Sequence, residues 1–194
     1  LIPGCQHLPQ QEQTAGITAV STIFPISDIL SNLAGNTVTV SSLLPPGASP
    51  HTFEPSVDQV KAISSARLLV YVGAGLDNWA LKLADAAELP ISIIELSSLV
   101  MNLETDLELN TDPHFWLDPV IVRDVICPPL AEELIKLLPE KEEEIRSNLN
   151  CYQDKLTALD QEIRSTTATF RQRKFISLHA AWKYFARRYG LEEV

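Results

Sequence analysis

The 194-residue sequence lacks the features of several large protein classes. It has no apolar run of about 18 residues, so no segment is predicted to span a membrane. Its 15 Lys and Arg are outnumbered by 25 Asp and Glu, which gives a net charge of −10. A protein that binds nucleic acid needs clustered basic residues against the phosphates, so we expect no nucleic-acid partner. With 45% apolar and 21% charged residues, the composition is typical of a folded domain.

Motifs for nucleophilic catalysis and nucleotide binding are also missing. The sequence has no G-x-S-x-G elbow, no C-x-x-C pair and no glycine-rich phosphate loop. The stretch VGAGLDN at 72–78 has two glycines after an apolar run, but it lacks the third glycine of a dinucleotide-binding motif. We interpret it as a tight turn between a strand and a helix.

Four apolar runs rich in β-branched residues alternate with helix-like segments, which predicts an α/β fold. The runs are ITAVSTIF, TVTVSSLL, RLLVYV and ISIIEL, which begin at Ile17, Thr37, Arg67 and Ile91. This order implies a parallel sheet with helices on both faces. Ser56 and Asp77 lie where helix N-caps are expected, and Gly35 lies just past a predicted helix end.

A different pattern begins at Pro139. The next thirty or so residues contain no further proline and no glycine, and one apolar stripe runs along them at spacings of three and four. A helix of that length extends roughly 45 Å, so it either forms a coiled coil or runs past one domain into another. After it, a strand at 174–178 and a helix ending at Gly190 form a single βα unit. We read this unit as the beginning of a second, truncated α/β lobe.

The pattern divides the chain into four parts. Residues 1–16 are an N-terminal tail, 17–138 a first α/β lobe, 139–170 a linking helix and 171–194 the beginning of the second lobe. The tail contains LIPGCQ, which is similar to the end of a bacterial lipoprotein signal in which Cys5 is lipidated. The alternative is an unrelated cysteine. Cys127 and Cys151 fall in predicted helices, where we expect buried thiols, with a mutual disulfide as the lesser alternative.

The sequence has only four histidines, and we assign no role to His7 in the tail. His51 follows the second predicted strand, His114 precedes a helix, and His179 follows the last strand. Ligands of open α/β sheets bind at the carboxyl ends of strands, so the fold can bring these side chains together. Three imidazoles with a free fourth position indicate a zinc-type site. For any one histidine taken alone, a helix cap or a core residue is the more common role.

Acidic residues lie near the three histidines. They are Glu54, Asp112 and Asp118. We expect them to act as helix caps, or as partners that hold an imidazole in one tautomer, rather than as metal ligands.

Three segments together resemble a known family. LLPPGASPHTFEPSVDQV, DPHFWLDP and LHAAWKYFARRYGL are similar to signature stretches of the metal-binding substrate-binding proteins of bacterial zinc and manganese ABC importers, the ZnuA/TroA type. The resemblance covers residues 17–191. It implies a monomeric, lipid-anchored receptor in the periplasm or at the cell surface, without enzymatic activity, that delivers zinc, manganese or iron to a membrane permease.

The resemblance also implies the ligands. His51 and His114 would bind the metal from the first lobe and His179 from the second, with a fourth, acidic ligand beyond Val194. A third imidazole in place of a carboxylate favours Zn²⁺ over Mn²⁺ or Fe²⁺. Two alternatives remain open: a three-histidine zinc hydrolase or hydratase, and a manganese- or iron-specific receptor or adhesin of the same family. Pro50 departs from zinc-binding members that carry an acid there.

Overall fold

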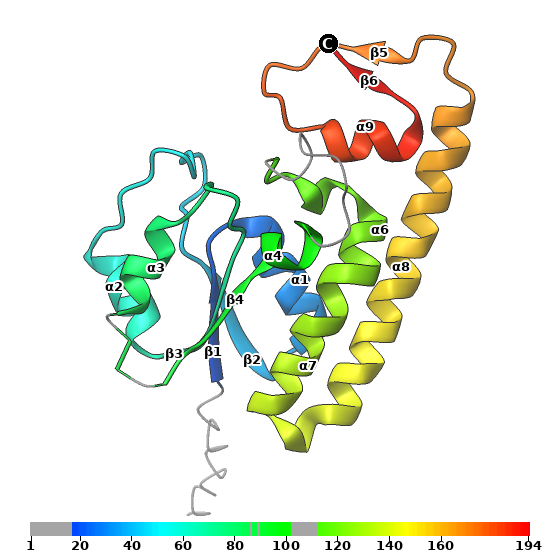
Figure 1. Cartoon of the computed structure of the whole chain (residues 1–194). Helices are drawn as coiled ribbons and strands as arrows, with labels where there is room; N and C mark the ends of the chain where they lie inside the picture. The colour runs from blue at the N-terminus through cyan, green and yellow to red at the C-terminus, as the bar shows by residue number, and fades with distance from the viewer. Residues whose placement is uncertain (1–16, 86, 89, 102–111) are drawn as a thin grey trace, which may run out of the picture.

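A four-stranded parallel sheet forms the centre of the first lobe (Figure 1). The structure is a computed structural model that describes residues 17–85, 87–88, 90–101 and 112–194. The strand order is β2-β1-β3-β4. The strands are β1 (Ile17–Ser21), β2 (Val38–Ser42), β3 (Ala66–Tyr71) and β4 (Ser92–Glu95). All three neighbouring pairs are parallel, which confirms the predicted sheet.

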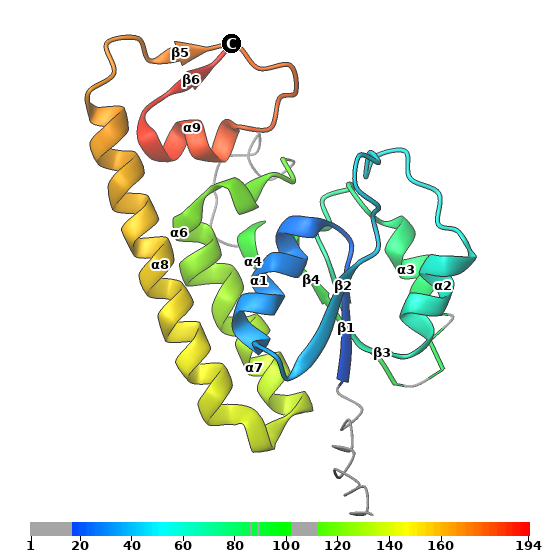
Figure 2. The same cartoon turned by 180° about the vertical axis from the view of Figure 1, so that it is seen from behind.

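Helices cover both faces of this sheet. Those between the strands and after β4 are α1 (Phe24–Ala34), α2 (Val57–Ser64), α3 (Trp79–Ala84) and α4 (Leu96–Met101). Side chains of β3 alternate between two cores, with Leu68 and Val70 in one and Leu69 and Tyr71 in the other. Figure 2 shows α2 and α3 on one side and α1 on the other. Burial on both faces explains why the strands read as continuous apolar runs.

Two of the three predicted helix-end residues are confirmed. Ser56 caps α2 with a capping box, in which its backbone N–H donates to Gln59 Oε1 at 2.9 Å and its hydroxyl accepts from Asp58 N at 3.3 Å. Gly35 ends α1 with a φ of +59°. These local signals are strong because each satisfies a helix-end group that has no partner within the helix.

The prediction for Asp77 is wrong. Asn78 precedes α3, and the carboxylate of Asp77 is fully buried and accepts from Val72 N at 2.8 Å and Gly73 N at 2.9 Å. It therefore closes the turn after β3 rather than capping the helix. The predicted tight turn is confirmed: Gly73 has a φ of +82°, and a Cβ there would lie 2.2 Å from Ser97 Oγ.

A helical stretch follows the second histidine and contains a π-helical segment. It consists of η1 (Phe115–Leu117), α6 (Pro119–Ile121), η2 (Val122–Ile126) and α7 (Cys127–Leu137). Within η2 the Cys127 N–H donates to the Val122 carbonyl. In the same register the carbonyl of Arg123 would pair with Pro128, which has no N–H. The amide of Gln153 donates to that carbonyl instead, at 3.0 Å.

Gln153→Leu should therefore lower the free energy of unfolding by about 1–3 kcal/mol, because it leaves the Arg123 carbonyl without its donor. Urea unfolding of the two proteins measures the difference. Gln161→Leu, at an exposed position of the same helix, is the matched control and should change stability by no more than about 0.5 kcal/mol. Equal losses in the two variants would contradict the assignment.

One long helix runs past the first lobe. After η3 (Pro139–Lys141), α8 spans Glu142–Ala168, so its 27 residues extend about 40 Å. It packs against α1, α6 and α7 and then reaches the C-terminal segment (Figure 1). Ile145 and Leu156 of its apolar stripe are buried, whereas Leu159 is 44% exposed. The sequence left two possibilities for this helix, a coiled coil or a helix that runs past one domain into another. The structure shows the second.

The C-terminal segment is a partial second lobe. It contains β5 (Lys174–Phe175), α9 (Lys183–Tyr189) and β6 (Glu192–Glu193), with β5 and β6 parallel. The predicted strand 174–178 is wrong beyond Phe175, because the chain turns where the Ser177 hydroxyl donates to the His179 carbonyl at 2.9 Å. As predicted, α9 ends at Gly190, whose backbone is in the left-handed conformation. The four-part division of the chain stays a prediction.

The two described cysteines are not bonded to each other. Cys127 is buried, and burial raises the pKa of its thiol to about 12. Cys151 is exposed, so the prediction of burial is wrong there, and the disulfide alternative is wrong as well. Cys5 lies outside the described residues. Across the described ranges, none of the helices combines the length and apolar character needed to cross a membrane.

Candidate metal centre

Three histidines from distant parts of the sequence lie together. One ligand nitrogen from each of His51, His114 and His179 can be chosen so that all three lie within 4.8 Å of one another. The Nε2 atoms of His114 and His179 are 3.1 Å apart. The His51 and His179 ring centroids are separated by 6.2 Å. The structure therefore brings together all three histidines that the sequence singled out.

The loop between β2 and α2 carries the exposed His51. Gly47 turns this loop with a φ of +81°. The indole N–H of Trp79, at the start of α3, donates to the Pro50 carbonyl at 3.1 Å. The Phe53 ring packs edge-on against Trp79 with centroids 4.8 Å apart. The residues on both sides of His51 are thus anchored to α3, which limits the movement of the loop that carries it.

His114 is buried and directly precedes η1. Its Nδ1 lies 2.7 Å from Asp112 Oδ1, which also accepts the backbone N–H of His114 at 2.9 Å. Burial of Asp112 opposes its ionisation. The hydrogen bonds from His114 outweigh burial and hold the pKa of Asp112 below its ordinary value. Because a carboxylate only accepts, Nδ1 carries the proton and the Nε2 lone pair faces His179.

The exposed His179 lies in the loop between β5 and α9. Its carbonyl accepts from Ala181 N at 2.8 Å and from the Ser177 hydroxyl. The Glu193 carboxylate in β6 accepts from Trp182 N at 3.1 Å and also from Ser177. Hydrogen bonds of Ser177 on one side of His179, and of Ala181 and Trp182 on the other, therefore hold the loop.

The spacing of the imidazoles fits a metal ion. Two nitrogens bound tetrahedrally at 2.0–2.1 Å from zinc lie about 3.3 Å apart, close to the 3.1 Å between His114 and His179. Nitrogen ligands of this kind suit borderline divalent transition metals better than Ca²⁺ or Mg²⁺. A carboxylate that orients a ligating imidazole, as Asp112 does for His114, is a regular feature of zinc sites.

The acids near the histidines have separate roles. We expected these acids to hold an imidazole or to cap a helix. Asp112 confirms the first role, because it holds the ring of His114. Asp118 confirms the second, because its carboxylate accepts hydrogen bonds from backbone N–H groups in the first turn of α6. Glu54 is exposed. Sequence reasoning missed Trp79. The available signal was its position as an aromatic residue directly after the VGAGLDN turn. It also missed Arg188, which donates to Asp118 at 2.7 Å and had no local signal.

Comparisons with known proteins find zinc- and manganese-binding relatives. Residues 19–194 match the family model described as zinc-uptake complex component A, periplasmic. The chain is 28% identical to the zinc-binding lipoprotein AdcA of Streptococcus pneumoniae, over 95% of this chain and 40% of that protein. It is 27% identical to the manganese-binding lipoprotein MntA of Halalkalibacterium halodurans, over 98% of this chain and 64% of that protein.

Solved structures show the same fold. The crystal structure of ZnuA superposes with a TM-score of 0.84 at 32% identity, covering 92% of this chain and 69% of that one. The chain thus spans roughly 40–70% of the length of these similar proteins. The matching family consists of binding proteins, which decides against the hydrolase and hydratase alternative. The match over residues 19–194 shows that the chain belongs to the ZnuA family of metal-binding solute-binding proteins.

Proposed function

We propose that this chain captures a divalent transition metal, with zinc preferred, as part of an extracytoplasmic receptor that delivers the ion to an ABC importer permease. The observation that carries the proposal is the convergence of three imidazole nitrogens within 4.8 Å. His51 and His114 belong to the first lobe and His179 to the second, so a bound ion would join the two lobes. The names of AdcA and MntA support a metal as the ligand.

The choice of zinc rests on the ligand set. Three neutral nitrogen donors suit a borderline ion, whereas manganese prefers sites richer in oxygen. The same relatives include a zinc-binding and a manganese-binding lipoprotein, so Mn²⁺ and Fe²⁺ are the competing ligands to measure. The adhesin alternative stays a prediction.

Calorimetric titration of the intact protein with Zn²⁺ and Mn²⁺ tests the proposal. We expect one Zn²⁺ per chain, bound more tightly than Mn²⁺. Affinity should fall as the pH is lowered, because protons compete with the metal for the imidazole nitrogens. Absence of Zn²⁺ binding would refute the metal-receptor function, and preference for Mn²⁺ would refute the choice of zinc.

Membrane attachment is a separate part of the proposal. The two relatives named above are lipoproteins, and LIPGCQ places Cys5 where a lipidated cysteine is expected. Mass spectrometry of the protein purified from a bacterial membrane fraction should show an acylated Cys5. Cys5→Ser should release the protein from that fraction without changing Zn²⁺ affinity, and an unmodified Cys5 would contradict the anchor.

Asp112→Asn should weaken Zn²⁺ binding by about 10- to 100-fold. The amide removes the negative charge beside Nδ1 of His114 and lets the ring turn or change tautomer. Titration of Asp112→Asn measures the change, and Asp124→Asn, at an exposed ion pair with Arg123, is the matched control. Equal affinity in the two variants would contradict a role for Asp112 in orienting His114.

A further inference from the structure

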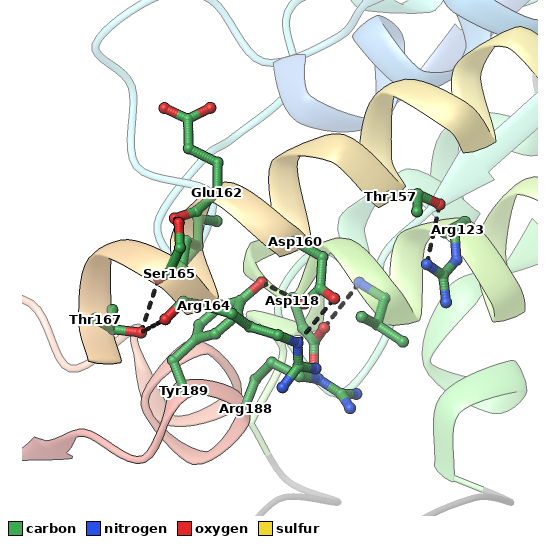
Figure 3. Close-up of polar contacts among 12 residues, drawn as sticks. Asp118, Arg123, Thr157, Asp160, Glu162, Arg164, Ser165, Thr167, Arg188 and Tyr189 are labelled. Carbon is green, nitrogen blue, oxygen red and sulfur yellow. Dashed lines mark hydrogen bonds and ion pairs between the residues drawn. The ribbon is translucent and has the colours of Figure 1, made fainter. Parts of the chain in front are cut away.

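The helix that follows His179 is tied to the rest of the molecule by polar contacts (Figure 3). Arg188 Nε donates to Asp118 Oδ2 at 2.7 Å. The hydroxyl of Tyr189 donates to Asp160 Oδ1 in α8 at 3.1 Å. Figure 3 shows these side chains of α9 meeting Asp160 of α8 and Asp118, the residue that caps α6. The contacts hold α9 against both helices.

The ion pair with Arg188 has a buried carboxylate at one end. The side chain of Asp118 is only 3% exposed, and that of Arg188 is 31% exposed. Asp118 Oδ1 accepts from Val120 N at 2.9 Å and Ile121 N at 3.3 Å, which leaves Oδ2 for the guanidinium. A buried carboxylate needs a positive partner, so removing Arg188 leaves an uncompensated charge and disfavours the docked position of α9.

The same ion pair bridges the two segments that carry the histidines. Asp118 lies one helical turn after His114, at the beginning of α6, and Arg188 lies in the helix that follows His179. The pair therefore links the same two segments that bring the Nε2 atoms of His114 and His179 to 3.1 Å. It joins two protein side chains, neither of which belongs to the three-histidine cluster.

We propose that the Asp118–Arg188 ion pair positions His179 against His114 before a metal arrives. This inference rests on the proposed metal-binding function for its effect on affinity. A site that is already assembled loses less conformational freedom on binding. If only a fraction of the molecules is docked, the apparent affinity falls by that fraction. Arg188 and Asp118 are positioning residues and contact no metal in this scheme.

Spin labels test the docked position in the metal-free intact protein. The free, exposed Cys151 in α8 takes one label, and Leu178→Cys, beside His179, takes the other in a Cys5→Ser background. Double electron–electron resonance should give a single narrow distribution of the distance between the two labels. Arg188→Gln should broaden this distribution and shift it to other distances. Without labels, Arg188→Gln should weaken Zn²⁺ binding about tenfold if one molecule in ten stays docked. Arg188→Lys, which keeps the charge, should recover part of both effects.

Arg146→Gln is the matched control, because Arg146 also links two helices through a carboxylate, Glu132, at 2.8 Å. It should leave the label distance and the Zn²⁺ affinity unchanged. An unchanged distance in Arg188→Gln would overturn the proposal, and so would a changed distance with wild-type Zn²⁺ affinity. Absence of Zn²⁺ binding by the wild-type protein would refute the proposed function, while the metal-free distances would still decide whether the ion pair docks α9.

Discussion

Replacing His51 with alanine should weaken Zn²⁺ binding by about 100- to 1,000-fold and leave the folded structure intact. Structural zinc sites contribute roughly 10–16 kcal/mol, so one of four ligands accounts for about 2.5–4 kcal/mol. His51 is exposed, so its removal opens no cavity in either core. Titration with Zn²⁺ measures the loss, and circular dichroism checks the fold.

His7→Ala is the matched control for His51→Ala. It removes a histidine from the N-terminal tail, to which we assign no ligand role. We expect wild-type affinity in this variant. If His51→Ala binds Zn²⁺ as tightly as His7→Ala does, His51 is not a ligand.

Phe115→Ala should lower the free energy of unfolding by about 3–5 kcal/mol. Phe115 is 1% exposed and lies in the core of the first lobe. Its ring meets that of Tyr184 in α9 edge-on, with centroids 6.4 Å apart. The substitution leaves a cavity at the residue that directly follows His114 in the sequence. It also removes the contact with the Tyr184 ring of α9. Chemical denaturation of the metal-free protein measures the change.

Phe24→Ala is the matched control for the cavity. Phe24 is 71% exposed, so its loss should change stability by no more than about 0.5 kcal/mol. Comparable losses in the two variants would contradict the assignment of Phe115 to the core. A large loss for Phe115→Ala alone would support it.

The sheet and its helices were predictable because their signals are local. Runs of β-branched residues gave the four strands, and the capping box at Ser56 and the glycine at position 35 gave two helix ends. Asp77 carries the same local signal as a capping residue. It was misassigned because two backbone N–H groups of the preceding turn compete for its carboxylate.

The candidate site was predictable only in part. The rarity of histidine and the resemblance of three segments to one family pointed to His51, His114 and His179, and the structure brings them together. The contacts that hold them come from elsewhere in the chain. Trp79 fixes the His51 loop from a neighbouring helix, and Arg188 reaches Asp118 across 70 residues of sequence. No local pattern encodes such pairings.

The exposure of Cys151 was predictable from the helix period. Its neighbours three and four residues away are polar: Ser147, Asn148, Asp154 and Lys155. The expectation of burial followed the residue type alone, whereas the face of α8 that packs against α1 and α7 is the apolar stripe. The stripe itself is buried at Ile145 and Leu156 but not at Leu159, because the helix extends beyond the first lobe there.

Zinc X-ray absorption spectroscopy of the zinc-loaded intact protein examines the three-histidine site itself. Ligation by His51, His114 and His179 predicts nitrogen ligands at about 2.0–2.1 Å and the scattering pattern of several imidazole rings. A spectrum dominated by sulfur at about 2.3 Å, or by oxygen ligands without imidazole scattering, would contradict the site.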